Sequence, residues 1–90
     1  MSKLTQIEIQ DTIKACVNEQ ITIAEAKWDW DASFVDDYGF DSLDLVELTM
    51  CLEEEFGMEF PDSEIEGLYT AAQCVQKLCE KEGIEYVRHA

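Results

Sequence analysis

The sequence predicts an all-α fold, a small four-helix bundle with three longer helices, one short helix and a long loop between the first two. Apolar residues recur at helical spacing in separate segments, helix-capping residues precede these segments, and Gly57 and Gly83 follow two of them. A chain of 90 residues is expected to form one domain over residues 1–90, with a core at about 5–83 and a flexible tail at 84–90.

The first helix is expected at residues 6–20. Thr5 and Glu8 have the spacing of a capping box, in which each side chain accepts a hydrogen bond from a backbone amide of the first turn. The apolar positions that follow at helical spacing are Ile9, Ile13, Cys16 and Val17. These positions place one side of this helix in the core.

A long ordered loop is expected at residues 24–40, because this segment has neither helical nor strand periodicity. Trp28 and Phe34 are expected to anchor it to the core, since a loop of this length needs anchors to stay ordered. Residues 24–27 favour a single helical turn. Trp30 either covers the rim of the core or faces a partner, and we favour the rim.

The second helix is expected to be capped by Asp41 and to end at Phe56, with an apolar stripe on each of two opposite faces. At about 100° per residue, one stripe is wide enough to face a core. It consists of Leu45, Leu48, Thr49, Leu52 and Phe56. The opposite stripe consists of Leu43, Val46 and Met50, flanked by Glu47, Glu53 and Glu54. A surface helix needs only one apolar face, so the second predicts an exposed docking strip.

Ser42 occupies the first helical position, where a side chain points outward and the helix dipole favours a bound anion. It does not fit a hydrolase nucleophile, because its neighbours lack the G-x-S-x-G pattern and the only histidine, His89, lies in the tail. The simplest alternative is that Ser42 is only a polar residue of the first turn.

The last third of the chain predicts an inward-facing Phe60, a short helix at about 62–68 and a final helix at 71–82 capped by Thr70. The apolar contacts of the short helix are Ile65 and Leu68. The inward side of the final helix carries Ala71, Cys74, Val75 and Leu78.

The charge balance limits the partners of this protein. The chain has 21 acidic and 6 basic residues and a net charge of −15, which argues against nucleic acid and disfavours anionic membranes. Proteins with basic patches are the expected partners, although high charge can also serve only solubility. The sequence contains no apolar run long enough to span a bilayer.

The four cysteines predict neither a disulfide framework nor a zinc site. Cys16 and Cys74 fall at apolar helical positions and no signal peptide is recognised, so we expect reduced thiols in a reducing compartment. No C-x-x-C pair is present.

The acidic loop does not predict a dedicated metal site either. Asp29, Asp31 and Ser33 alternate as in a calcium loop, but Phe34 and Phe40 stand where that loop needs glycine and glutamate. Loose binding of divalent cations to the acidic surface remains open. We find no carboxylate pair in surroundings suited to acid–base catalysis, so we expect no enzyme activity.

Residues 36–44, reading DDYGFDSLD, and the helix that follows them closely resemble the acyl carrier proteins of dissociated (type II) fatty-acid synthesis. The D-S-L triplet is the attachment motif of that family, and the resemblance extends over about residues 6–82. Tyr38 and Phe40 depart from it, standing where leucine and a smaller residue are common, as does the pair Trp28 and Trp30. The first two departures could alter transferase recognition.

The resemblance implies that Ser42 carries 4′-phosphopantetheine, attached from coenzyme A by a phosphopantetheinyl transferase, and that the thiol of this arm holds an acyl group. It implies that partner enzymes contact Asp41, Leu43, Asp44, Val46, Glu47, Met50, Glu53 and Glu54. Candidates for the lining of an acyl pocket are Leu48, Leu52, Phe60, Ile65 and Leu68.

The expected function is therefore that of a non-catalytic, monomeric carrier of growing fatty acyl chains. Its implied partners are ketoacyl synthases, malonyl transferase, reductases, dehydratase and acyltransferases. Carriage of polyketide or aminoacyl groups, or a structural role in a larger complex, are the alternatives. The expected location is the cytoplasm, or an organelle matrix after removal of a presequence.

Overall fold

A computed structural model describes residues 5–60 and 67–87 of the chain. This part contains three α-helices, α1 (Gln6–Gln20), α2 (Ser42–Phe56) and α4 (Ala71–Glu82), and a 3-10 helix, η1 (Glu25–Lys27). The predicted all-α class is confirmed, and η1 is the helical turn expected at 24–27. The short helix expected at about 62–68 falls largely on residues 61–66, which lie outside the described residues.

Each α-helix begins with a reciprocal capping box, in which two side chains accept hydrogen bonds from two backbone amides of the first turn. The pairs are Thr5 with Glu8, Asp41 with Asp44, and Thr70 with Gln73. Gly57 and Gly83 follow α2 and α4 in the left-handed conformation, with φ of 63° and 71°. These local signals explain why the helix boundaries agree with those expected from the sequence.

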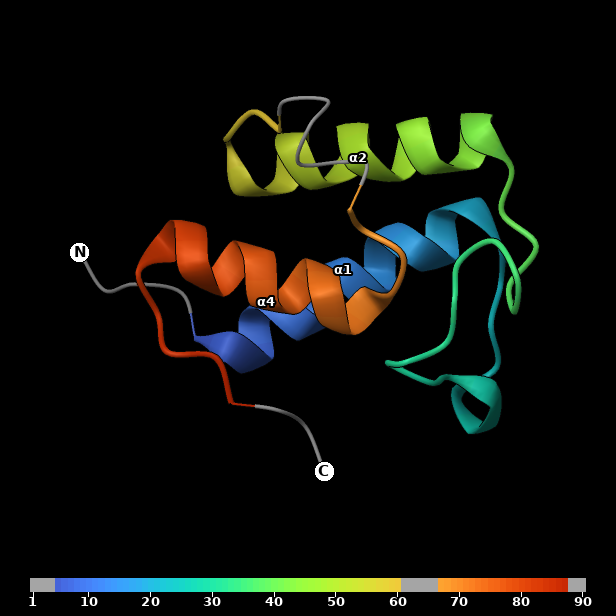
Figure 1. Cartoon of the computed structure of the whole chain (residues 1–90), viewed down its shortest axis with the longest axis horizontal. Helices are drawn as coiled ribbons and strands as arrows, with labels where there is room; N and C mark the ends of the chain where they lie inside the picture. The colour runs from blue at the N-terminus through green and yellow to red at the C-terminus, as the bar shows by residue number, and fades with distance from the viewer. Residues whose placement is uncertain (1–4, 61–66, 88–90) are drawn as a thin grey trace.

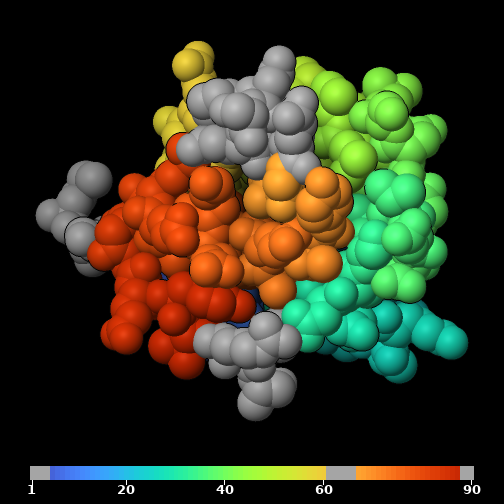
Figure 2. Space-filling view, viewed as in Figure 1, coloured from blue at the N-terminus to red at the C-terminus, as the bar shows by residue number. Residues whose placement is uncertain are grey.

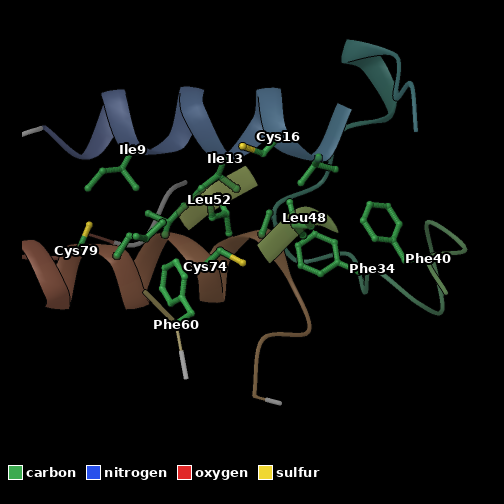
Figure 3. Close-up of a cluster of buried hydrophobic side chains, with 14 residues drawn as sticks. Ile9, Ile13, Cys16, Phe34, Phe40, Leu48, Leu52, Phe60, Cys74 and Cys79 are labelled. Carbon is green, nitrogen blue, oxygen red and sulfur yellow. The ribbon is translucent and has the colours of Figure 1, made fainter. Parts of the chain in front are cut away.

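The core lies where α1 packs against both α2 and α4. Figure 1 shows α4 crossing in front of α1, with α2 lying above both in this view. Buried side chains from the three helices and the long loop meet in one cluster (Figure 3). Phe60, expected to face inward, is buried in this cluster.

The long loop is attached to the start of α4. The Phe34 amide donates a hydrogen bond to the Tyr69 carbonyl at 2.9 Å, and the Ala72 amide donates to the Trp30 carbonyl at 2.9 Å. Figure 2 shows the loop directly beside this start of α4. Phe34 is buried, and Trp28 and Trp30 pack partly buried against the core, so both the predicted anchors and the predicted rim position of Trp30 are confirmed.

The chain after α4 continues to contact the domain. Ile84 and Tyr86 pack against the core. The Gln6 side chain donates to the Val87 carbonyl at 2.6 Å and accepts from the Val87 amide at 2.8 Å. Packing thus continues beyond residue 83, where the sequence placed the end of the core, while the flexibility of the tail stays a prediction.

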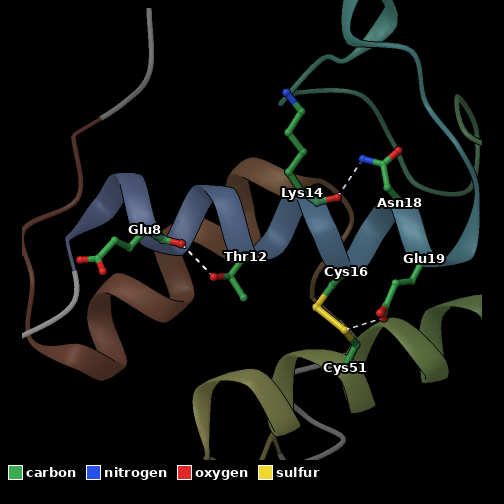
Figure 4. Close-up of a disulfide and its surroundings, with 7 residues drawn as sticks. All are labelled: Glu8, Thr12, Lys14, Cys16, Asn18, Glu19 and Cys51. Carbon is green, nitrogen blue, oxygen red and sulfur yellow. Dashed lines mark hydrogen bonds between the residues drawn. A yellow bond between two sulfur atoms is a disulfide. The ribbon is translucent and has the colours of Figure 1, made fainter.

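The expectation that Cys16 is a reduced thiol is wrong for this structure. Cys16 on α1 and Cys51 on α2 form a disulfide with a Cα–Cα distance of 5.9 Å (Figure 4). Helical periodicity places each cysteine on a face of its own helix, but it does not give the register between two helices whose cysteines are 35 residues apart in the sequence. Cys74 and Cys79 are free and buried, as expected for Cys74.

Within residues 5–60 and 67–87, no helix has both the length and the apolar character that crossing a membrane requires.

Candidate functional site

Ser42 is exposed at the first turn of α2, as the sequence predicted. The turn is fixed by its two neighbours. The Asp44 amide donates to Asp41 Oδ1 at 2.9 Å, and the Asp41 amide donates to Asp44 Oδ2 at 3.0 Å. Because both carboxylates are used in capping, the helix start is held in place while the hydroxyl of Ser42 stays accessible.

The backbone beside Ser42 suits an anionic group. An α-helix leaves its first amides without partners inside the helix. Here the capping box satisfies those of Asp41 and Asp44, so within the described part of the chain the amides of Ser42 and Leu43 are left to solvent or to a ligand. They point from the positive end of the helix dipole, which favours phosphate. A phosphate joined to the Ser42 hydroxyl therefore fits this helix start.

The second apolar stripe of α2 faces solvent. Its three side chains, Leu43, Val46 and Met50, are 64%, 53% and 54% exposed, and we call them the recognition strip. Glu47 and Glu54 are exposed beside it. The predicted exposure of the strip is confirmed, and the result is an apolar surface bordered by carboxylates.

Three other residues expected to contact partners also have structural roles. Asp41 and Asp44 cap α2. Glu53 is half-buried, and its carboxylate accepts a hydrogen bond from the Phe60 amide at 2.8 Å. Substituting any of these three would disturb the fold as well as a contact, so the strip itself and Glu47 and Glu54 are the better positions for testing recognition.

A small cavity of about 30 Å³ lies behind α2. Its walls are formed by Phe34, Leu45, Leu48, Thr49, Leu52, Leu68 and Cys74. Three of the predicted pocket residues, Leu48, Leu52 and Leu68, are among them. Phe60 is buried elsewhere in the core, and Ile65 lies outside the described residues. A space of this size holds about one or two water molecules, so an acyl chain could enter only if the bundle expanded.

The sequence missed four wall residues of this cavity. Leu45 and Thr49 belong to the core-facing stripe of α2, which was recognised without being connected to a cavity. Phe34 was recognised only as a loop anchor, and Cys74 only as a core position. Their convergence depends on how the loop and α4 pack against α2, which periodicity does not reveal.

The Cys74 thiol adjoins this cavity but is not reactive. Burial raises the pKa of Cys74 to about 12, because desolvation disfavours the thiolate. The thiolate is the nucleophilic form of cysteine. Near neutral pH this side chain therefore acts as a small apolar residue.

The aromatic residues that depart from the family pattern brace the loop before Ser42. The Tyr38 hydroxyl accepts from the Asp29 amide at 2.9 Å and donates to the Asp29 carbonyl at 3.1 Å. The Trp28 ring lies 5.0 Å from that of Trp30 and 6.1 Å from that of Tyr38, between centroids.

Phe40 has a similar supporting position. It is buried and stacks on Phe34 with 5.3 Å between ring centroids. Its amide also donates to the Phe34 carbonyl at 2.8 Å. A buried ring cannot contact a partner protein directly, so Phe40 instead supports the chain that leads into α2 and Ser42.

The fold and the site together define a class of protein. An exposed serine at a fixed helix start, with free amides beside it and an apolar strip next to it, is suited to carrying a covalently attached group to partner proteins. Among the described residues, no three side chains of the metal-ligating kinds converge.

Residues 11–80 match the phosphopantetheine attachment site family, and the chain belongs to this family. The match includes all of α2 and most of α1 and α4. The family attaches 4′-phosphopantetheine covalently, and its members are carrier domains that are generally non-catalytic. Such a domain interacts with a phosphopantetheinyl transferase and with synthase partners.

Proposed function

We propose that this chain is an acyl carrier protein of type II fatty-acid synthesis, with Ser42 as its attachment residue. The observation that carries the proposal is the exposed Ser42 hydroxyl at the start of α2, beside two amides free to hold a phosphate. The D-S-L sequence at residues 41–43 and the acidic helix after it support the same role.

Loading breaks the phosphoanhydride bond of coenzyme A and forms a phosphate ester to Ser42. The Ser42 oxygen bonds to the phosphorus that bears the pantetheine arm of coenzyme A, the hydroxyl proton is lost, and adenosine bisphosphate leaves. The transferase supplies the catalytic groups. This chain supplies a nucleophile held at a helix end that favours the new phosphodiester.

The recognition strip and its carboxylates suit a carrier that visits many enzymes. Charge on Glu47 and Glu54 accelerates encounter with basic surfaces, and the small apolar area of the strip limits the time spent bound. The proposed partners are ketoacyl synthases, malonyl transferase, reductases, dehydratase and acyltransferases, besides the transferase that loads Ser42.

The test is the intact mass of the protein after incubation with coenzyme A and a phosphopantetheinyl transferase. We expect the wild type to gain the mass of one phosphopantetheine group and Ser42→Ala to gain none. Ser33→Ala is the matched control, because it removes a hydroxyl from the loop before α2, where Ser33 Oγ accepts from the Asp36 amide. Equal gain by wild type and Ser42→Ala, or no gain by the wild type, would overturn the proposal.

The nature of the cargo needs a separate measurement. We expect the protein isolated from its native cell to carry saturated or partly reduced fatty acyl thioesters, identified by the mass of the fragment released from the arm. A polyketide or aminoacyl thioester would contradict the fatty-acid role and leave the carrier role intact. A stoichiometric complex that persists when fatty-acid synthesis is blocked would favour the structural role.

A further inference from the structure

The disulfide between Cys16 and Cys51 ties α1 to the helix that carries Ser42. Neither cysteine belongs to the recognition strip, and neither forms a wall of the cavity behind α2. The link therefore has no part in attachment or docking as described above, although it restrains α2, which supplies four of the seven wall residues of that cavity.

The disulfide lies beside a hollow in the surface. A surface hollow of about 240 Å³ lies between α1 and α2, and its walls are Asp11, Thr12, Ala15, Cys16, Glu19, Cys51 and Glu55. Cys16 is buried, whereas Cys51 is half-buried. A small thiol or disulfide reagent in this hollow would reach the sulfur of Cys51 first.

The link restricts the movement that a long acyl chain would require. The cavity behind α2 measures about 30 Å³, so admitting a chain requires its walls to separate, and four of the seven wall residues belong to α2. A disulfide keeps the two Cα atoms within about 7 Å of each other. With the bond broken, only non-covalent packing holds α2 against α1 at this point.

We propose that Cys16 and Cys51 form a redox clasp, which limits the entry of long acyl chains when oxidised and permits it when reduced. This inference rests on the proposed carrier function. Closing is a thiol–disulfide exchange with a small-molecule disulfide. The Cys51 thiolate attacks one sulfur of the reagent and releases one thiol, and the Cys16 thiolate then displaces the second. Two electrons pass to the reagent, which takes up the two protons, and a dithiol reverses the reaction.

The negative charges around the disulfide should favour neutral over anionic thiols as reducing agents. Glu19 Oε2 lies 3.0 Å from Cys51 Sγ (Figure 4), and Asp11 and Glu55 line the same hollow. These carboxylates repel anionic thiols. We expect a neutral dithiol to open the clasp faster than the anionic tripeptide glutathione at equal thiolate concentration, with a difference that shrinks as salt is added.

The first test uses protein loaded on Ser42 with a long acyl chain, so that the thiol of the arm is blocked. The clasp is left oxidised or is opened with a phosphine, which is then removed, and the thioester is cleaved with hydroxylamine. We expect cleavage to be several-fold slower in the reduced protein, because its chain is sheltered. Protein carrying an acetyl group, and the variant Cys51→Ser with the long chain, should show no dependence on redox treatment.

The second measurement needs no loading. Hydrogen exchange of the α2 amides in the unmodified protein should be faster after reduction, and Cys51→Ser should exchange like the reduced wild type under both treatments. Unchanged exchange would overturn the clasp, as would equal cleavage rates for the long-chain thioester in the two redox states. Failure of Ser42 to accept the arm would instead refute the carrier function, so the two failures are distinguishable.

Discussion

The helices α2 and α4 are both amphipathic, but they use their surfaces differently. The 12 residues of α4 bury six side chains, whereas the 15 residues of α2 bury only Leu48, Thr49 and Leu52. The carboxylates of α2 have no basic residue beside them in the helix, while α4 balances two lysines against two glutamates. By these measures α4 contributes mainly to the core, whereas α2 presents a large part of its surface to solvent.

The difference shows where stability and function are separated in this small domain. The recognition strip of α2 exposes three large apolar side chains that contribute little to the core. Exposed apolar side chains grouped beside like charges indicate a contact surface. Changes on α4 should therefore affect folding, whereas changes on the outer face of α2 should affect recognition.

The largest expected effect is a difference between substitutions on the two helices in how much they lower the free energy of unfolding. Leu78 on α4 is 0% exposed, so Leu78→Ala should lower the free energy of unfolding by about 2–5 kcal/mol through lost contacts and a cavity. Val46→Ala on α2 should change it by less than about 0.5 kcal/mol. Denaturant unfolding measures both, with the disulfide intact. Similar losses for the two variants would contradict the division of roles.

The interior face of α4 should also give a pH signature. Cys74 has a pKa of about 12 in the folded protein, against 9.0 for an ordinary thiol. Because the pKa of Cys74 is higher in the folded protein than in the unfolded chain, the buried neutral thiol stabilises the fold fully below the unfolded pKa. This stabilisation is lost progressively as the pH rises from the unfolded pKa to the folded pKa. Between those two values, Cys74 should reduce the free energy of unfolding by up to about 1.4 kcal/mol per pH unit.

The measurement is the free energy of unfolding of wild type and Cys74→Ala as a function of pH. Below pH 9.0 the two curves should run parallel. Above this pH the free energy of unfolding of the wild type should fall more steeply than that of Cys74→Ala. Cys79, whose pKa burial also raises, is present in both proteins and cancels. Curves that remain parallel throughout would show that the thiol is not desolvated.

The unbalanced charge of α2 should make the fold sensitive to ionic strength. With a net charge of −15, added salt or millimolar-range divalent cation should raise the melting temperature, by about 4–8 °C for each kcal/mol of repulsion relieved. The double variant Glu47→Gln with Glu54→Gln should respond less. A flat or falling melting temperature would mean that repulsion does not limit stability.

The smallest expected effect concerns the rate of encounter. The same double variant should associate with the transferase about threefold more slowly at low ionic strength and approach the wild-type rate at high salt. Glu80→Gln with Glu82→Gln removes the same charge from α4 and should have a smaller effect. Stopped-flow measurement gives the association rate of each double variant. Equal slowing of association by the two variants would mean that only the total charge matters, and not its position on α2.

Signals within a few residues of each other were sufficient to predict much of this structure. The capping pair at Thr5 and Glu8, the start of α2 at Asp41 and the exposure of Ser42 all follow from local sequence. Contacts that depend on how segments far apart come together were missed. The Cys16–Cys51 disulfide and the pairing of Gln6 with Val87 belong to this second kind. The recognition strip could be predicted because all its residues lie on one helix. The cavity behind α2 could not, because its walls come from several segments that meet only in the folded structure.

The measurement that tests the central claim most directly is the position of the attached arm. Cleavage after Lys27 and Lys77 releases residues 28–77, which contain Ser33, Ser42 and Ser63. After loading with coenzyme A and a phosphopantetheinyl transferase, fragmentation of this peptide should place the added mass on Ser42 alone. Modification of Ser33 or Ser63, or an unmodified peptide from fully folded protein, would contradict the account.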